Sequence, residues 1–170
     1  MAAYYRGDYA TALREWRPLA EQGSAIAQNN LGLMYSEGKG ASRDYAEAVG
    51  WWRKAAEQGY AKAQYNLGVM YDEGLGVPQD DAEAVGWWRK AAEQGYAKAQ
   101  SRLGVMYDNG KGVPQDYAQA HKWYNLAASR FPPGEDHDRA VKDSNIVAIC
   151  MTPAQISEAQ KLAREWRPKK

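Results

Sequence analysis

Cysteine and histidine are nearly absent from this sequence. One cysteine, Cys150, and two histidines, His121 and His137, occur among 170 residues. A single cysteine cannot form an intramolecular disulfide, and these three residues have none of the close spacings that structural zinc sites use. We therefore expect no metal and no cofactor. We also expect Cys150 to be a small apolar residue within a packed segment and not a reactive thiol.

An excess of one charge and a long apolar run are also missing. Lys and Arg number 22 against 21 Asp and Glu, and no basic block stands out, so nucleic acid is not an expected partner. No run of about 18 apolar residues could span a membrane, so we expect a soluble chain. No signal peptide is present, and Met1 to Tyr5 resembles the tail of a helix. For the sequence as given, the expected compartment is the cytoplasm. If an upstream signal peptide was removed, the expected location is the periplasm or the outside of the cell.

What the sequence does contain is repetition. The stretch AEAVGWWRKAAEQGYAKAQ occurs at 46–64 and again, unchanged, at 82–100. A reactive group is normally needed once, whereas a unit that stacks on copies of itself needs the same contact surface at every step. Five columns recur every 36 residues: Gly38, Gly74 and Gly110; Gly40, Gly76 and Gly112; Leu31, Leu67 and Leu103; Tyr35, Tyr71 and Tyr107; Gly23, Gly59 and Gly95. The sequence is therefore a repeat array.

Each repeat contains two helices. The first is predicted over 61–73, where Ala63, Leu67 and Tyr71 recur every fourth residue on one face. A Gly-x-Gly loop follows, and the second helix begins after Asp80, a residue type that caps helix N-termini. Its apolar face includes Trp88, and the helix ends at a glycine. The equivalent caps in the other repeats are Asp44 and Asp116.

The predicted organisation is one structural domain with five segments. A half repeat occupies 1–23, full repeats occupy 24–59, 60–95 and 96–131, and a helical cap occupies 132–170. In the cap we predict a helix over 136–150 and a last helix that begins at Thr152, with Pro153 at its first position and Gln155 completing a capping box. The fold class is all-α: a right-handed α-α superhelix, or solenoid, of helix-loop-helix repeats with a C-terminal capping helix.

The repeat resembles a known family. The pattern A-x-A-Q-x-x-L-G-x-M-Y-x-x-G-x-G-V-x-x-D-x-x-x-A-x-x-W-x-x-x-A-A-x-x-G at 61–95 is similar to the Sel-1-like repeat, a relative of the tetratricopeptide repeat. The ending at 151–166 resembles the tail of bacterial members. The resemblance implies a non-catalytic adaptor or scaffold for protein complexes, in bacteria often exported or envelope-associated. A cysteine-rich branch is described as binding penicillin. The alternative function is therefore an envelope protein that binds a peptidoglycan or β-lactam-type ligand, although this chain lacks those cysteines.

No catalytic set stands out. Asp116, His121 and Ser129 supply the residue types of a catalytic triad. His121, however, occupies the position of Gly50 and Gly86 in the other repeats, which favours a surface or edge role. We therefore predict that the chain is not an enzyme.

The resemblance also implies where a partner binds. In tetratricopeptide geometry the first helix of each repeat lines the concave side, so a protein or peptide partner, as an extended peptide or a helix, is expected there with Tyr65 as anchor. An alternative for some of the expected groove residues, especially Leu33, Val69 and Val105, is that they pack within the repeat array. A homodimer through the N-terminal edge is also predicted. The expected groove residues are Ile26, Asn29, Asn30, Leu33, Lys62, Tyr65, Asn66, Val69, Asp72, Lys98, Ser101, Arg102, Val105 and Asp108.

Overall fold

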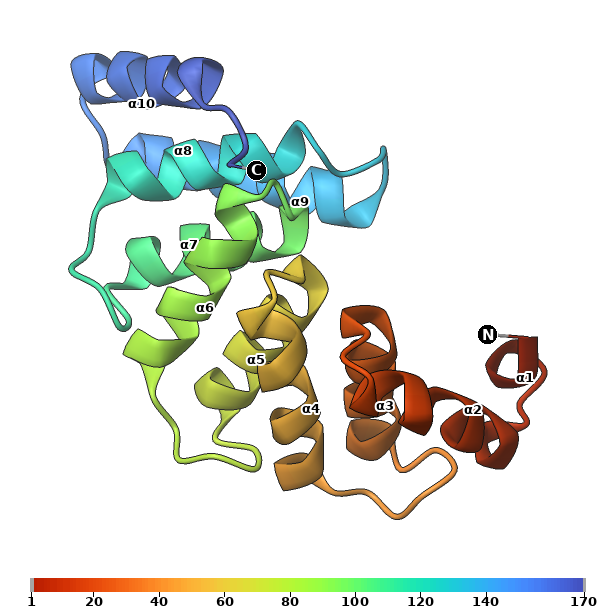
Figure 1. Ribbon diagram of the computed structural model, residues 1–170. Helices are drawn as coiled ribbons and strands as arrows, with labels where there is room; N and C mark the ends of the chain where they lie inside the picture. The colour runs from red at the N-terminus through yellow and green to blue at the C-terminus, as the bar shows by residue number, and fades with distance from the viewer. Residues whose placement is uncertain (1, 170) are drawn as a thin grey trace. The chain divides into compact units, whose positions relative to one another are not determined.

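The computed structural model describes residues 2–169, which form ten α-helices and no strand (Figure 1). The chain divides into two compact units, Met1–Asp80 and Asp81–Lys170. The first unit contains α1 (Ala2–Tyr5), α2 (Tyr9–Glu21), α3 (Ala25–Glu37), α4 (Tyr45–Glu57) and α5 (Ala61–Glu73). The second contains α6 (Asp81–Glu93), α7 (Ala97–Asn109), α8 (Tyr117–Ala128), α9 (Glu135–Ile149) and α10 (Pro153–Glu165). Helices adjacent in sequence pack against each other in both units, except that α10 packs against α8.

The predicted helix starts are confirmed at three places. Asp44 and Asp116 accept hydrogen bonds from the amides of Glu47 and Gln119, each at 3.0 Å, and so cap α4 and α8. Thr152 caps α10 in a reciprocal capping box with Gln155. These side chains satisfy backbone N–H groups that have no partner within the helix itself. Local sequence signals therefore define where these helices begin.

One glutamine in each repeat ties the first helix to the helix before it. Gln28, Gln64 and Gln100 are buried, and their side-chain amides donate to the carbonyls of Ala20, Ala56 and Ala92 at 3.0, 3.1 and 3.1 Å. A buried amide hydrogen bond is costly to leave unmade, so it fixes how the two helices meet. Because the same pair recurs at every step, it forms part of the repeated joint.

A glycine in the first helix makes room for an aromatic ring of the next helix. A Cβ atom added at Gly32 would lie 2.6 Å from Nε1 of Trp52, and one at Gly104 would lie 2.6 Å from the Tyr124 ring. The Trp52 indole also donates to the carbonyl of Asn29 at 3.2 Å. The absence of a side chain at these two positions therefore lets neighbouring helices approach closely.

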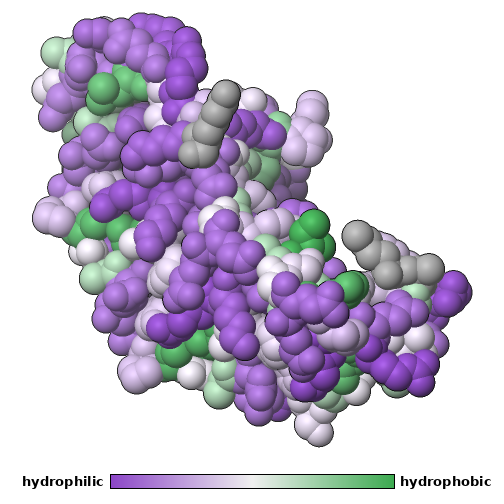
Figure 2. All heavy atoms as spheres, in the orientation of Figure 1, coloured by the Kyte–Doolittle hydropathy of each residue, from purple (hydrophilic) through white to green (hydrophobic). Residues whose placement is uncertain are grey.

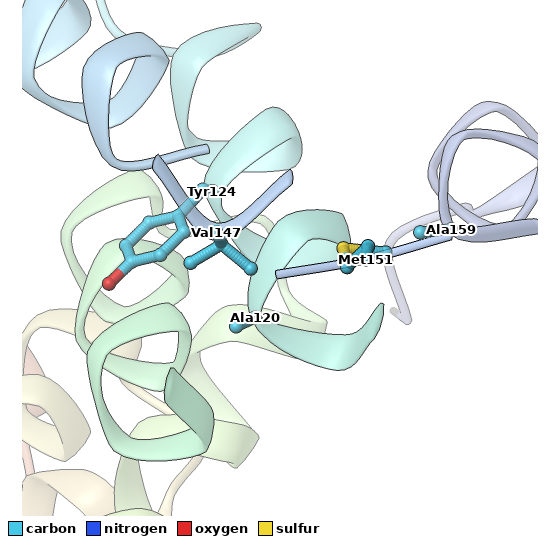
Figure 3. Close-up of a cluster of buried hydrophobic side chains, with 5 residues drawn as sticks. All are labelled: Ala120, Tyr124, Val147, Met151 and Ala159. Carbon is cyan, nitrogen blue, oxygen red and sulfur yellow. The ribbon is translucent and has the colours of Figure 1, made fainter. Parts of the chain in front are cut away.

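The C-terminal helices of the second unit cover α8. Ala120 and Tyr124 of α8 form a buried cluster with Val147 of α9, Met151 and Ala159 of α10. Figure 3 shows Val147 beside the Tyr124 ring, and Met151 on the side of the cluster that faces Ala159. The helix predicted over 136–150 is confirmed as α9, which packs on α8 through residues outside the repeat pattern.

Two expectations about single residues are wrong. Cys150 is exposed, because the buried stripe of the segment runs through Ala140, Ser144, Val147 and Met151 and leaves Cys150 off that face. His121 is buried, although we predicted a surface or edge role. Its ring lies 2.7 Å from the Asn125 amide, and burial lowers the pKa of the imidazole. Both helices of the C-terminal cap, α9 and α10, pack on α8, the helix that carries His121.

Candidate functional site

A cavity lies against one face of α3, within the Met1–Asp80 unit. Its volume is about 300 Å³. We call it the α3 pocket; it is lined by Tyr4, Tyr5, Trp16, Ile26, Asn30, Leu33, Tyr60 and Lys62. Ile26, Asn30, Leu33 and Lys62 are four of the groove residues expected from the sequence. The structure thus brings residues of α1, α2, α3 and the start of α5 to one place.

The aromatic wall of the α3 pocket is built around Tyr4. Its ring centroid lies 5.4 Å from that of Trp16 and 5.9 Å from that of Tyr5. The Tyr4 hydroxyl donates to Glu37 at 3.3 Å and accepts from Lys39 at 3.3 Å, while Lys39 and Glu37 pair at 2.8 Å. The hydrogen bonds to Glu37 and Tyr4 raise the pKa of Lys39 above its ordinary value. The wall is therefore held in position by contacts with α3 and the loop that follows it.

Three groups of the α3 pocket that can donate hydrogen bonds have no partner. Asn30 is half-buried, and its side-chain oxygen accepts a long contact from the Asn29 amide at 3.5 Å. Among residues 2–169, the side-chain NH2 of Asn30, the ammonium of Lys62 and the hydroxyl of Tyr60 have no partner. Among the described residues, none of those that line the cavity is acidic. The pocket therefore combines apolar and aromatic side chains with a cation and uncharged polar groups.

The other groove residues expected in this unit lie outside the α3 pocket. Asn29 is 7% exposed and accepts a hydrogen bond from Asn66 at 3.3 Å, so this pair links α3 to α5. Tyr65, the expected anchor, is half-buried on α5, as are Val69 and Asp72. Asn29 and Asn66 therefore act first as a hydrogen-bonded joint between two helices of the array.

In the second unit the expected groove residues have different surroundings. Val105 packs against the buried cluster of Figure 3, which includes residues of the C-terminal cap. Burial raises the pKa of Asp108, and the nearby charge of Asp143 on α9 adds to the effect. The Arg102 guanidinium lies 5.6 Å from the centre of the Trp88 ring, while Lys98 is exposed and Ser101 half-buried. The cap thus occupies space beside Val105 and Asp108 that we expected to be open.

The position of Asp108 gives a pH-dependent prediction. Because its pKa is higher in the folded chain than in the unfolded one, the charged carboxylate opposes folding at neutral pH, and this cost disappears as the pH falls through the folded-state pKa. Asp108→Asn is expected to raise the free energy of unfolding at about pH 7, and to lose that advantage near about pH 3. Urea unfolding at both pH values measures this. The control is Glu158→Gln, an exposed carboxylate on α10; an equal gain for Asp108→Asn at both pH values would contradict the account.

The residues that supply the types of a catalytic triad have other partners. Asp116 caps α8, His121 contacts Asn125, and the Ser129 hydroxyl donates to the carbonyl of Leu126 at 2.8 Å. Within residues 2–169 there is no group of three or more His, Cys, Asp or Glu side chains that could hold a metal ion. None of the helices in the same range combines the length and apolar character that a membrane span requires.

One face of the chain is mostly hydrophilic. Figure 2 shows one face, on which hydrophobic residues form small patches separated by hydrophilic ones. Near the N-terminus, Ala12 and Trp16 of α2 are buried, whereas Leu19 and Tyr5 are exposed. A dimer through this edge stays a prediction.

The repeated helix pairs and the glutamine joint that recurs in each repeat define an all-α repeat protein of the solenoid class. Three consecutive copies of the Sel1 repeat match residues 25–60, 61–96 and 97–130. The chain therefore belongs to the Sel1 repeat family, whose members are generally scaffolds for protein interactions. The fold class predicted from the sequence is confirmed.

Two solved structures are similar to this chain. The Sel1 repeat protein from Oxalobacter formigenes is 33% identical with a TM-score of 0.80, and the match covers 96% of this chain and 65% of that one. The protein c5321, a protective antigen present in uropathogenic Escherichia coli strains that displays an SLR fold, is 32% identical with a TM-score of 0.75, over 96% of this chain and 44% of its own. This chain is thus shorter than both relatives. No curated protein matched the sequence.

Four of the eight residues that line the α3 pocket were not predicted from the sequence. Tyr4, Tyr5 and Trp16 belong to the half repeat at 1–23, in which no groove residue was expected, and Tyr60 stands at a joint where the preceding repeat has Ser24. The available signal was the cluster of aromatic residues near the N-terminus. Only the fold shows that α1 lies close enough to α3 to share a cavity with it.

Proposed function

We propose that this chain is a protein-interaction module that binds a peptide segment of its partner in the α3 pocket. One observation carries the proposal: apolar and aromatic side chains surround a cavity in which the side-chain NH2 of Asn30, the ammonium of Lys62 and the hydroxyl of Tyr60 have no partner among residues 2–169. Ligand sites commonly have this composition, with apolar walls and a few convergent polar groups that fix orientation. A volume of about 300 Å³ is at the small end of such sites, which suits one or two peptide side chains.

The repeat architecture supports the proposal because it holds the pocket walls rigid. Trp16 is almost fully buried, and Gln28 ties α3 to α2 through the carbonyl of Ala20. A preformed wall loses little conformational freedom on binding, which favours affinity. The membership of the Sel1 repeat family favours a protein partner.

Ile26 provides the test. It is 49% exposed on α3 and lines the pocket, whereas Ile146 is 50% exposed on α9 and lies in the other unit. A peptide selected by the purified chain from a displayed random library serves as probe, and fluorescence anisotropy measures its affinity. Ile26→Asp is expected to weaken binding at least about tenfold, because a charge enters the apolar wall. Ile146→Asp is expected to leave it unchanged.

Circular dichroism establishes that both variants are folded. Equal affinities for the original chain and folded Ile26→Asp would place the peptide elsewhere and overturn the proposal. Loss of binding in Ile146→Asp alone would point to α9 as the binding surface and would overturn it as well.

A further inference from the structure

We infer that Asp108, Asp143 and Tyr124 form a second binding site, which takes an arginine side chain of a partner protein. We call these three residues the acidic site. They come from α7, α9 and α8 of the second unit, whereas the α3 pocket lies in the first unit. The inference therefore goes beyond the proposed function and names a separate contact with its own chemistry.

The Tyr124 ring brings the two carboxylates of the acidic site together. The ring lies against α7 at Gly104, where an added Cβ atom would be 2.6 Å from it, and Figure 3 shows it beside Val147 of α9. Asp108 follows Gly104 by four residues, and Asp143 precedes Val147 by four. Because residues four apart are neighbours on a helix surface, each carboxylate lies one turn from a residue beside the ring.

The three groups are within electrostatic reach of one another. Burial raises the pKa of Asp108, and the charge of Asp143 raises it further. Burial also raises the pKa of the Tyr124 hydroxyl, and the charges of both carboxylates add to that effect. No lysine or arginine among the described residues offsets either shift. The acidic site is thus negatively charged and has no cation of its own in this part of the chain.

The side chains of the acidic site have no hydrogen-bond or ion-pair partner within residues 2–169. The Gln115 amide donates at 2.7 Å to the backbone carbonyl of Asp108, not to its carboxylate. Tyr124 is only 2% exposed, and a hydroxyl on so buried a side chain normally has a partner. In Figure 3 its oxygen points away from Ala120 and Met151. An unpaired hydroxyl beside two unpaired carboxylates indicates that a donor is supplied from outside.

A guanidinium matches this arrangement better than other cations. Arginine has five N–H donors in one plane, so it can donate to two carboxylates and a phenolic oxygen at once. It is also more weakly hydrated than the ammonium of lysine, which lowers the cost of entering a site whose two carboxylates are half-buried. Within residues 2–169 no three His, Cys, Asp or Glu side chains are grouped to hold a metal ion, which favours an organic cation.

Capped heptapeptides with a central arginine test the inference. They are synthesised as an array with acetylated N-termini and amidated C-termini, beside matched arrays with lysine or with citrulline, an uncharged isostere, at the centre. Fluorescence anisotropy then measures the affinity of the arginine peptide that binds most tightly. It is expected to bind at least about tenfold more tightly than its citrulline counterpart, and more tightly than its lysine counterpart. Equal binding of either counterpart would overturn the inference, and so would an array without arginine ligands.

Substitutions in the acidic site place the arginine. Asp143→Asn is expected to weaken binding of the arginine peptide at least about tenfold, and Asp108→Asn by a similar factor. Because Asp108→Asn is expected to stabilise the fold at neutral pH, its loss of binding would not come from unfolding. Tyr124→Phe, which removes only the hydroxyl, is expected to weaken binding about threefold. Circular dichroism establishes that each variant is folded.

Asp136→Asn is the matched control. Asp136 is exposed on α9, so its replacement removes the same charge from the same helix and is expected to leave the affinity unchanged. Ile26→Asp, in the α3 pocket, should also leave it unchanged. An equal loss for Asp136→Asn and Asp143→Asn would show a general effect of charge and would overturn the inference. Unaltered affinity in folded Asp143→Asn would overturn it as well and leave the proposed function standing.

Discussion

Replacing Trp52 with alanine is expected to lower the free energy of unfolding of the Met1–Asp80 unit by about 3–5 kcal/mol. The side chain is 3% exposed, and its ring lies directly against Gly32 of the preceding helix. Its removal leaves a cavity between α3 and α4 and deprives the buried Asn29 carbonyl of its indole donor. Urea unfolding followed by circular dichroism and extrapolated to zero denaturant measures the loss.

Glu57→Ala is the control for this substitution. Glu57 is exposed on the same helix, so its replacement is expected to change the free energy of unfolding by no more than about 0.5 kcal/mol. A loss below about 1 kcal/mol for Trp52→Ala would contradict the account, because removal of a large ring buried between two helices leaves a cavity that costs more than this.

Gly76→Ala is expected to lower the free energy of unfolding by about 2–5 kcal/mol. The residue has a φ of +71°, a region that costs other L-residues about 1–2 kcal/mol. A Cβ atom there would also lie 2.5 Å from the Tyr45 carbonyl carbon and oxygen, because the loop rests on the first turn of α4. Backbone cannot swing aside as a side chain can, so this collision adds about 1–3 kcal/mol.

Gly59→Ala separates the two causes. Gly59 has a φ of +87°, but a Cβ atom there would meet nothing within 4 Å, so only the cost of the backbone conformation applies. Thermal and urea unfolding measure the loss of free energy of unfolding in each variant. The loss for Gly76→Ala should exceed that for Gly59→Ala by the cost of the collision. Equal losses for Gly59→Ala and Gly76→Ala would show that the loop does not rest on α4.

The repeats were predictable because each joint occurs several times in the sequence. One occurrence of Gln28 or Gly32 says little, but recurrence at a spacing of 36 residues identifies both as parts of a stacking surface. Caps at Asp44 and Asp116 were predictable for a different reason: a capping side chain acts on amides only a few residues away. Local and periodic signals therefore suffice for most of the fold.

The remainder depends on contacts that do not repeat. His121 is buried on α8, on which both α9 and α10 pack, and nothing in the repeat pattern predicts those two contacts. Val105 packs against a cluster that includes residues of the cap, and Asp108 lies near Asp143 of α9. The α3 pocket was half predicted: Ile26, Asn30, Leu33 and Lys62 followed from the geometry of related repeats. Its aromatic wall required knowledge of how α1 packs, and surface positions are under too little packing constraint for a sequence to mark them.

The central claim is that the α3 pocket binds a peptide, and an NMR titration tests it most directly. Amide spectra of the 15N-labelled chain are recorded as a peptide selected from the displayed random library is added. The account predicts that the largest shift changes fall in residues 26–33 and 60–62 and around Tyr4 and Tyr5, with none of comparable size on α9 or α10. Changes concentrated on α9 or α10, with the α3 pocket unaffected, would contradict it.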